Sequence, residues 1–553
     1  MALAGPAEDD YAIAAEHYSQ QRYPAATTEF RKFLRNHRSH VLAANSQFFL
    51  AESLHQQGDY AAAGEEFAHF TADYPEHRFA AQAGFRQGET AYLQGLYSAA
   101  RPKLAGFVAA HPRDKLCEFA WPYLGDIELE LGDFAAAQKA YGQALKSYPA
   151  GPLAAECRLG LGRAAEALND PEEARRFYQF LADRDEHELS REAQLRLGRL
   201  LFQTRDFAEA SNYLRPLAES KAALPQRTPA RYWLGQMLNA QGKRDDACKV
   251  WRQAVEQDAE HPLAPTVCLA WADALRTGGD FKTASEQYQR LVKSWPQSDA
   301  ADDALLAQLE LAIDAKQWTD ADTLAQQFER TYATSPLQAN VQAAQAYGWL
   351  QQARFAEAMV VLKELSRADS PRRLQQLYWL ALAQLGAKEY TAALETITSI
   401  KSEKLSAEVQ AGILATEGIA LVALKRPEEA LVPLNKYIGQ HPQGADLPRC
   451  RAQHCIALVQ LGRFDAATAA WRDYVKAHAQ HPALLPTTLY MAEAAYGARQ
   501  NATARELFEW LAQEQQPAEY RTQANTALAW LEQSANEPAK SVAKLDRVLN
   551  DRP

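Results

Sequence analysis

The sequence predicts an all-α protein, an α-solenoid of about fifteen stacked helix pairs. Three observations support this fold class. The composition favours helices over strands, a turn motif recurs about every 37 residues, and an alanine follows that motif at a constant distance. Internal repeats with a period of roughly 20–50 residues are typical of solenoids, whose core grows along the chain instead of closing into a globule.

The composition supports the helical prediction and narrows the classes of partner. Ala, Leu, Gln, Glu and Arg dominate, whereas the β-branched residues Val and Ile are scarce. A net charge of −10 over 553 residues predicts a soluble chain without general affinity for nucleic acid or for an anionic membrane surface. No apolar run approaches the roughly 18 residues that a membrane-spanning helix requires, so no membrane insertion is expected.

The turn motif has the form Gly-Asp-aromatic-x-x-Ala, as in Gly58-Asp59-Tyr60 and Gly132-Asp133-Phe134. An alanine stands three residues after the aromatic position in fourteen of the fifteen units. The interval is 37 residues, except for 36 before Phe207 and 35 before Tyr390. The residues at the aromatic position are Tyr23, Tyr60, Tyr97, Phe134, Pro171, Phe207, Arg244, Phe281, Trp318, Phe355, Tyr390, Pro427, Phe464, Asn501 and Pro538.

Each unit is predicted to contain two helices joined by this turn. The Gly ends the first helix because the position after a helix adopts positive φ, and the Asp caps the second through its carboxylate. Asp206 with Glu209 forms a predicted capping box. The alanine is expected where the two helices cross, since a larger side chain would separate them.

The segment from Trp121 to Pro149 resembles the tetratricopeptide repeat family. It contains Trp121-x-x-Leu124-Gly125, then Phe134-x-x-Ala137, Tyr141 and Pro149, and Leu-Gly recurs in later units. The resemblance implies a right-handed superhelix and protein-binding activity. It covers residues 10–553 as one continuous superhelix, with residues 1–9 as an N-terminal tail and a bend near residues 219–230. Units nine to eleven depart from the pattern, with Leu309, Ala346 and Ala381 where Gly often stands.

The location of the protein is suggested by two features. The 37-residue unit with a Tyr-Pro or His-Pro join resembles bacterial cell-envelope members of the family, the outer-membrane assembly and TolA-binding proteins. Ala2-Leu3-Ala4-Gly5 resembles the end of a removed signal peptide. Both features favour the periplasm or cell envelope, and the cytoplasm is the alternative.

No catalytic motif is present, and no enzyme or cofactor is predicted. The sequence contains no phosphate-binding loop, nucleophile elbow or zinc-protease motif. The six cysteines lack metal-binding spacing and are expected to be buried thiols. Glu186-His187-Glu188 carries metal-ligating residue types, but two acids around one histidine are common in polar loops.

The family's groove-facing positions, carried onto this chain, give the candidate partner-binding residues. An aromatic ladder beside carboxylates suits a segment with apolar anchors and Lys or Arg. The alternative is that the aromatics only pack between first helices while the acids face solvent. Arg163 and Arg199 either grip a carboxylate or pair with Glu166 or Glu192. The candidates are Tyr11, Phe48, Glu52, His55, Phe85, Glu89, Tyr92, Asp126, Arg163 and Arg199.

The sequence therefore predicts a non-catalytic scaffold that presents a superhelical groove to partner proteins or peptides. Two alternatives remain open. The chain ends at Pro553 without a polar cap, and Val542, Leu545 and Val548 would leave an apolar face open. This suggests either the repeat arm of a larger enzyme or envelope assembly, truncated at Pro553, or end-to-end self-association through the C-terminal unit.

Overall fold

The computed structural model describes residues 5–184, 188–401 and 403–550, and these residues form thirty α-helices and no strand. They divide into two compact units, residues 1–284 and 285–553, with the division inside α16 (Phe281–Ser294). The all-α solenoid prediction is confirmed. The first helix starts at Pro6, so residues 6–9, which we assigned to a tail, belong to that helix.

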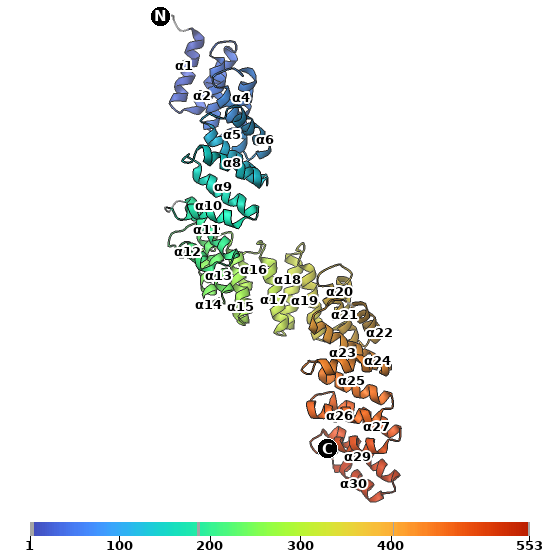
Figure 1. The fold of residues 1–553 in the computed structure, drawn as a ribbon. Coiled ribbons are helices and arrows are strands. Elements are labelled where there is room, and N and C mark those ends of the chain that lie inside the picture. The colour runs from blue at the N-terminus through green and yellow to red at the C-terminus, as the bar shows by residue number, and fades with distance from the viewer. Residues whose placement is uncertain (1–4, 185–187, 402, 551–553) are drawn as a thin grey trace. The chain divides into compact units, whose positions relative to one another are not determined.

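In the first unit, the first helix of each pair is odd-numbered and the second is even-numbered, and the pairs follow one another along the chain (Figure 1). Each helix packs against the next one, and successive odd-numbered helices also contact each other. The helices are α1 (Pro6–Ser19), α2 (Tyr23–Asn36), α3 (Ala43–Gln56), α4 (Tyr60–Asp73), α5 (Ala80–Leu93), α6 (Tyr97–Ala110), α7 (Cys117–Glu130), α8 (Phe134–Ser147), α9 (Ala154–Ala167), α10 (Pro171–Ala182), α11 (Glu188–Gln203), α12 (Phe207–Ala218), α13 (Arg227–Ala240), α14 (Arg244–Gln257) and α15 (Ala264–Thr277).

The second unit repeats the same arrangement. Its helices are α17 (Ala301–Asp314), α18 (Trp318–Thr331), α19 (Gln338–Gln351), α20 (Phe355–Leu365), α21 (Arg373–Gly386), α22 (Tyr390–Ile400), α23 (Ala407–Ala423), α24 (Pro427–Gln440), α25 (Leu447–Gln460), α26 (Phe464–His478), α27 (Leu484–Gly497), α28 (Asn501–Leu511), α29 (Ala518–Ser534) and α30 (Pro538–Asn550).

The turn inside every helix pair has the geometry that the motif predicts. Asp59 and Asp133 accept hydrogen bonds from the backbone N–H groups of Ala62 and Ala136, at 3.2 and 3.1 Å. All fifteen turns carry one residue at positive φ, directly before the capping position. Six of these residues are Gly and nine are not; Ala353, at φ 58°, is one of the nine. A left-handed conformation costs a residue with a Cβ about 1 kcal/mol, so these nine turns are mildly strained.

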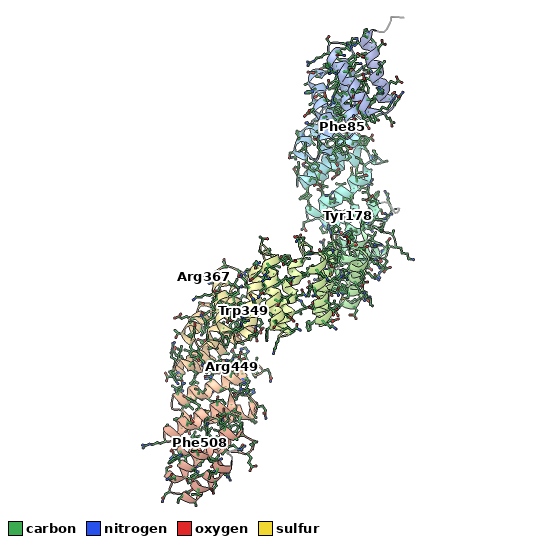
Figure 2. All side chains as sticks on the ribbon, turned by 180° about the vertical axis from the view of Figure 1, so that it is seen from behind. Phe85, Tyr178, Trp349, Arg367, Arg449 and Phe508 are labelled. Atoms are coloured by element: carbon green, nitrogen blue, oxygen red, sulfur yellow. The ribbon has the colours of Figure 1, made fainter. Side chains whose placement is uncertain are left out.

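The core lies between the two helices of each pair, where the predicted alanines are buried. Ala137 and Ala467 are fully buried, and Phe85, Tyr178 and Phe508 are also inside, whereas Arg367 and Arg449 project from the surface (Figure 2). Large buried side chains recur at helical spacing on the second helix of a pair, as with Phe67 and Phe70 on α4. Of the cysteines, five are buried and Cys248 is half-buried, and none forms a disulfide.

Positions sixteen residues apart in one pair have complementary sizes. A Cβ added to Gly125 would lie 2.4 Å from the Tyr141 ring, and one added to Gly235 would lie 2.2 Å from Trp251. In the ninth unit the sizes are reversed, because buried Leu309 stands at the Gly position and Ala325 at the aromatic one. This exchange keeps the volume between the helices filled and accounts for the departure of that unit from the family pattern.

The connection near residues 219–230, where we predicted a bend, is a loop between α12 and α13. Buried Arg231 bridges it: its Nε donates to the Ala218 carbonyl at 2.9 Å and its Nη1 to Asp258 Oδ2 at 2.9 Å. The two sides of the loop are therefore joined by charge-assisted hydrogen bonds.

Candidate functional site

The aromatic ladder predicted on the first helices is part of the core. Phe48 and Phe85 are only 2 % and 1 % exposed. Phe48 stacks on Phe79 with ring centroids 4.4 Å apart, and Phe85 packs on Phe107 at 5.6 Å. The expectation that these two rings face an open groove is wrong, because the neighbouring helices cover them.

Tyr11, the first residue of the same aromatic ladder, packs in the same way. Its ring lies 6.1 Å from that of Phe30 and 6.0 Å from that of Phe33, both on α2. Tyr11 is only partly covered, and burial raises the pKa of its phenol.

The carboxylates predicted beside the aromatic ladder are also covered, and they form a network of ion pairs. Glu52 and Glu89 are 4 % and 6 % exposed, and the Arg86 guanidinium lies between them, with its Nε donating to Glu52 Oε1 at 2.9 Å. Arg86 also donates to Glu89, and His55 Nε2 lies 3.2 Å from that carboxylate. Burial alone would raise the pKa of Glu89, but His55 and Arg86 hold it below its ordinary value. These charges are satisfied within the protein.

Tyr92 and Asp126 belong to a second network next to the first. The Tyr92 hydroxyl donates to Asp126 Oδ2 at 2.8 Å, and the Tyr141 hydroxyl donates to Oδ1 at 2.5 Å. The Tyr92 ring stacks on Tyr123 with centroids 4.6 Å apart. Burial, followed by the charge of Glu89, raises the pKa of Tyr123 to about 12. The phenols are therefore neutral donors in these networks.

Arg163 and Arg199 lie beside an open cavity of about 470 Å³ between α7, α9 and α11. Arg199 Nη2 donates to Glu166 Oε1 at 2.8 Å, which is the local pairing that the sequence offered as one alternative. Arg163 is 3.6 Å from Glu130 and largely exposed. Arg196, which the sequence analysis did not select, completes the basic lining.

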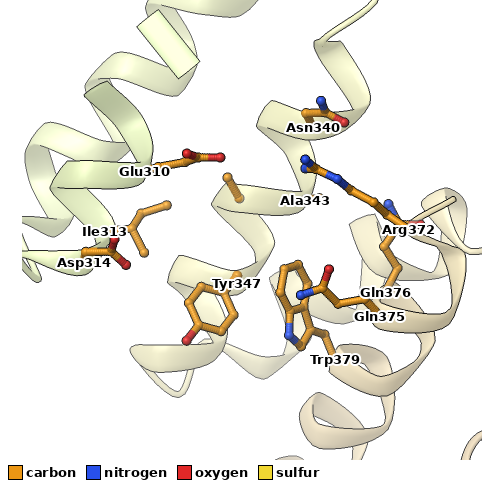
Figure 3. Close-up of a pocket in the computed structure, with 11 residues that line it drawn as sticks. Glu310, Ile313, Asp314, Asn340, Ala343, Tyr347, Arg372, Gln375, Gln376 and Trp379 are labelled. Carbon is orange, nitrogen blue, oxygen red and sulfur yellow. The ribbon is translucent and has the colours of Figure 1, made fainter. Parts of the chain in front are cut away.

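A different groove lies in the second unit, where three odd-numbered helices, α17, α19 and α21, are neighbours. They enclose a cavity of about 220 Å³ (Figure 3). The Tyr347 and Trp379 rings lie on its floor, with centroids 4.9 Å apart and planes inclined by 34°. Aromatic rings that remain partly accessible in a concave surface are typical anchor points for a ligand.

A second cavity, of about 640 Å³, continues the groove to α23 and shares Tyr347, Gln375 and Trp379 with the first. Tyr378 lines it and lies against α23 so closely that a Cβ on Gly412 would be 1.8 Å from the phenol oxygen. Burial raises the pKa of Tyr378. The groove thus extends across four odd-numbered helices.

The described residues of the first cavity include a buried polar group without a hydrogen-bond partner, as His55 Nδ1 is in the N-terminal unit. Gln376 is 4 % exposed, yet its side-chain oxygen has no hydrogen-bond partner among the described residues. Glu310 and Asp314 on α17 face Arg372, Gln375 and Trp379 across the cavity (Figure 3). A buried acceptor without a partner costs about 1–3 kcal/mol, and the Gln376 oxygen is itself shielded from solvent.

This groove was not among the predicted sites, because the charged and aromatic residues selected from the sequence all lie in the first units. A usable signal was present. The helix from Gln338 to Gln351 contains no charged residue but four glutamines, an asparagine, a tyrosine and a tryptophan. A first helix of this composition, rich in amides and aromatics and without charge, is suited to hydrogen bonding and ring stacking.

Two further observations concern metal sites and membranes. Within the described ranges, no group of three or more His, Cys, Asp and Glu side chains is placed to hold a metal ion. Glu186 and His187, two of the three residues considered for metal binding, lie outside the described residues, as do Ala2, Leu3, Ala4 and Pro553. In the same described part of the chain, none of the helices has both the length and the apolarity needed to cross a bilayer.

Comparison with known proteins identifies the repeat. The model of the tetratricopeptide repeat family matches residues 11–77, 124–188, 195–264 and 269–336. No curated protein matches the chain significantly in sequence.

Several solved structures are similar to this chain. A tetratricopeptide repeat protein from Parabacteroides merdae has 16 % identity and a TM-score of 0.34, over 48 % of this chain and 98 % of its own. The anaphase-promoting-complex structure Cut9–Hcn1 has 14 % identity and a TM-score of 0.34, over 99 % and 97 %. Pseudomonas aeruginosa pilF has 21 % identity and a TM-score of 0.32, over 41 % and 97 %.

The repeated helix pairs, the turn geometry and the four matched regions agree on one family. The chain therefore contains tetratricopeptide repeats.

Proposed function

We propose that this protein is a non-catalytic scaffold that holds extended or helical segments of partner proteins against its odd-numbered helices. Tetratricopeptide repeats support a protein-interaction role in general. The observation that carries the more specific proposal is the groove across α17, α19, α21 and α23, where aromatic rings and amide side chains remain accessible.

The dimensions of the groove suit a short segment. Neighbouring helices in a packed array are about 8–10 Å apart, so three steps from α17 to α23 span about 30 Å. An extended chain advances about 3.3 Å per residue, and about nine residues would cross the groove. Tyr347 and Trp379 would receive an apolar or planar side chain, while Gln351 and Gln375 would bond to the backbone of the segment.

The odd-numbered helices of the first unit offer fewer side chains for contact with a partner. Of the residues selected from the sequence, Phe48, Phe85, Glu52 and Glu89 are too deeply buried to contact a partner directly, and they shape the surface from beneath. The side chains that remain for direct contact are Tyr11, His55, Tyr92, Asp126, Arg163 and Arg199. Arg163, Arg196 and Arg199 beside their open cavity would favour an acidic segment.

The proposal is tested by selecting random dodecapeptides from a phage library on the full-length protein and measuring the affinity of the selected peptides. We expect Trp379→Ala to weaken binding of most of them at least tenfold, because a buried aromatic anchor commonly supplies more than 1.4 kcal/mol. The matched control is Trp530→Ala, since Trp530 is 59 % exposed on α29, far along the chain from the groove. Peptides that bind both variants and the wild type equally well would contradict the groove assignment.

Self-association is a second candidate, and one observation favours it. Leu545 on α30 is 44 % exposed, whereas the equivalent residues of the two preceding units, Phe508 and Trp471, are 2 % and 4 % exposed. Val542 and Leu549 extend this apolar face, which is flanked by Lys540 and Lys544. The acidic helix α1, with Glu8, Asp9, Asp10 and Glu16 and partly exposed Ile13, would complement it in a second copy of the chain.

This second candidate predicts that the sedimentation coefficient rises with protein concentration and that Leu545→Glu removes the rise. The substitution places a charge on an exposed position, so the fold should be retained. A sedimentation coefficient independent of concentration in the wild type would exclude the α30 interface.

A further inference from the structure

The groove in the second unit repeats along the helix array at a spacing that suits one conformation of a bound segment. Its first cavity lies between α17, α19 and α21 and its second between α19, α21 and α23, so one helix step separates them. We propose that this groove binds a proline-rich segment of a partner protein in the polyproline II conformation. The inference rests on the proposed function, since it names the class of segment that the groove would select.

The distance between neighbouring helices provides the first part of the argument. Packed helices lie about 8–10 Å apart. A polyproline II helix has three residues per turn and rises about 3.1 Å per residue, so equivalent side chains recur about every 9 Å. Every third residue of such a segment would therefore meet the next cavity along the groove. Side chains on one face of a β-strand recur about every 7 Å, so they lose this register after one or two helix steps.

The aromatic floor provides the second part. Tyr347 and Trp379 line both cavities, and their ring centroids are 4.9 Å apart. Both side chains are partly exposed. Grooves lined by aromatic rings are the surfaces on which proline-rich segments dock, because such a segment presents apolar rings and loses little conformational freedom on binding. The two rings supply this surface where the cavities meet.

The hydrogen-bond donors at the centre of the groove provide the third part. The Trp379 indole N–H and the Arg372 guanidinium can donate hydrogen bonds but cannot accept them. Arg372 extends from α21 into the first cavity (Figure 3), and neither side chain has a hydrogen-bond or ion-pair partner in the part of the chain that the structure describes. A polyproline II segment leaves its backbone carbonyls unpaired, and each proline removes an N–H. Its excess of acceptors therefore matches these donors.

Apart from Arg372, the charged groups of the groove lie toward its two ends. Asp314 on α17 lines the first cavity, whereas Lys404 and Glu408, near the start of α23, line the second with opposite charges. Glu310 already interacts within the protein, so its carboxylate is not available to a partner. The helix α19, which borders both cavities, contains no charged residue. The centre of the groove therefore suits an uncharged segment.

The walls and sizes of the two cavities agree with apolar residues spaced along such a segment. Ile313 and Ala344 contribute to the first cavity, and Leu374, Leu382 and Val409 to the second. The first, of about 220 Å³, is below the roughly 300–1,000 Å³ of sites that enclose a drug-sized ligand, so it suits a single side chain. The second, of about 640 Å³, has room for the residues that follow.

The test compares decaproline with a glycine–serine peptide of the same length. Both peptides are amidated and carry the same N-terminal fluorophore, and their binding to the full-length protein is measured by fluorescence anisotropy. Decaproline forms polyproline II in water, whereas the glycine–serine chain is a flexible coil. We expect decaproline to bind about tenfold more tightly or better, since it is already in the bound conformation. Equal binding of the two peptides, or no binding of decaproline, would overturn the proposal.

Two substitutions locate the binding in the groove. Trp379→Phe keeps an aromatic face but removes the N–H, and Arg372→Met removes the guanidinium donors, so each should weaken decaproline binding severalfold. Because Trp379 also packs against the core between α19 and α21, thermal unfolding of both variants is measured beside binding, and Arg372→Met should melt as the wild type does. The matched control is Trp530→Phe at the exposed Trp530 of α29, which should bind as the wild type does. Decaproline affinity that is unchanged in Trp379→Phe and in Arg372→Met would refute the groove as its site.

The dodecapeptide selection separates this inference from the proposed function. Peptides that depend on Trp379 and are enriched in two prolines three residues apart would support both. Peptides that depend on Trp379 without enrichment of proline would retain the groove as a peptide site and refute the proline-rich occupant. The absence of any Trp379-dependent peptide, decaproline included, would refute both.

Discussion

The inner faces of the two units differ in how their charged side chains are paired. Along α3, α5 and α7, carboxylates, arginine and tyrosines pair with one another, as in the Glu52–Arg86–Glu89 network. Along α17, α19 and α21, Gln376 and Arg372 lack such partners within the described chain. A concentration of charged and aromatic residues in the sequence therefore does not by itself indicate an accessible surface in this repeat.

The largest expected effect comes from removing one arginine from the inner face of each unit. Arg86→Met should lower the free energy of unfolding of the N-terminal helices by about 3 kcal/mol, because it leaves two carboxylates buried without their cation. Arg372→Met should change stability by less than about 0.5 kcal/mol, since no described group depends on it. Hydrogen exchange of peptides from α3–α6 and α19–α22 measures both effects. Similar losses in the two variants would remove the distinction.

The comparison also explains how much could be predicted from the sequence. The turns and helix limits were predictable because they depend on local residues, the Gly and Asp of each turn and the alanine that follows. The spacing of Phe48 and Phe85 predicted that they share one ladder, but their rings contact Phe79 and Phe107, and their burial depends on how closely the neighbouring helices cover them. The groove at Trp379 depends on which polar groups remain unpaired after folding, and spacing alone does not contain that information.

A second prediction concerns the steric matching that holds the helix pairs together. Gly235→Val should lower stability by about 1–3 kcal/mol, because the new side chain overlaps the Trp251 indole, which is held by a 3.2 Å hydrogen bond to the Tyr232 carbonyl. Gly439→Ala is the control, since no atom lies within 4 Å of its added Cβ, and it should be neutral or slightly stabilising. Denaturant titration of both variants makes the comparison. If the denaturation midpoint of Gly235→Val equals that of the wild type, the two helices of this pair can move apart without loss of stability.

The smallest expected effect concerns the turns within the helix pairs, because the two units differ in the residue type at the positive-φ position. In the second unit six of seven turns place a non-glycine residue at positive φ, against three of eight in the first. Ala353→Gly should therefore stabilise the protein by about 0.5–1 kcal/mol through relief of strain. Ala356→Gly, at an exposed position in the first turn of α20, should have the opposite sign, because fixing a glycine in the helical conformation costs more backbone entropy than fixing an alanine. The thermal midpoints of the two variants should move in opposite directions.

The steric match between positions sixteen residues apart has a consequence for the history of such a chain. Both members of a match belong to one helix pair, so duplication or loss of a 37-residue stretch from join to join leaves every remaining match intact. A genetic crossover between the helices of a pair would instead combine residues that were never selected together. Joining the helix that carries Leu309 to the one that carries Trp251 would place two bulky residues at one crossing. The proline-containing joins are therefore the positions at which this gene can lengthen, shorten or exchange repeats while keeping the matches within each pair, although matches between neighbouring pairs, such as that of Gly160 with Tyr141, would change.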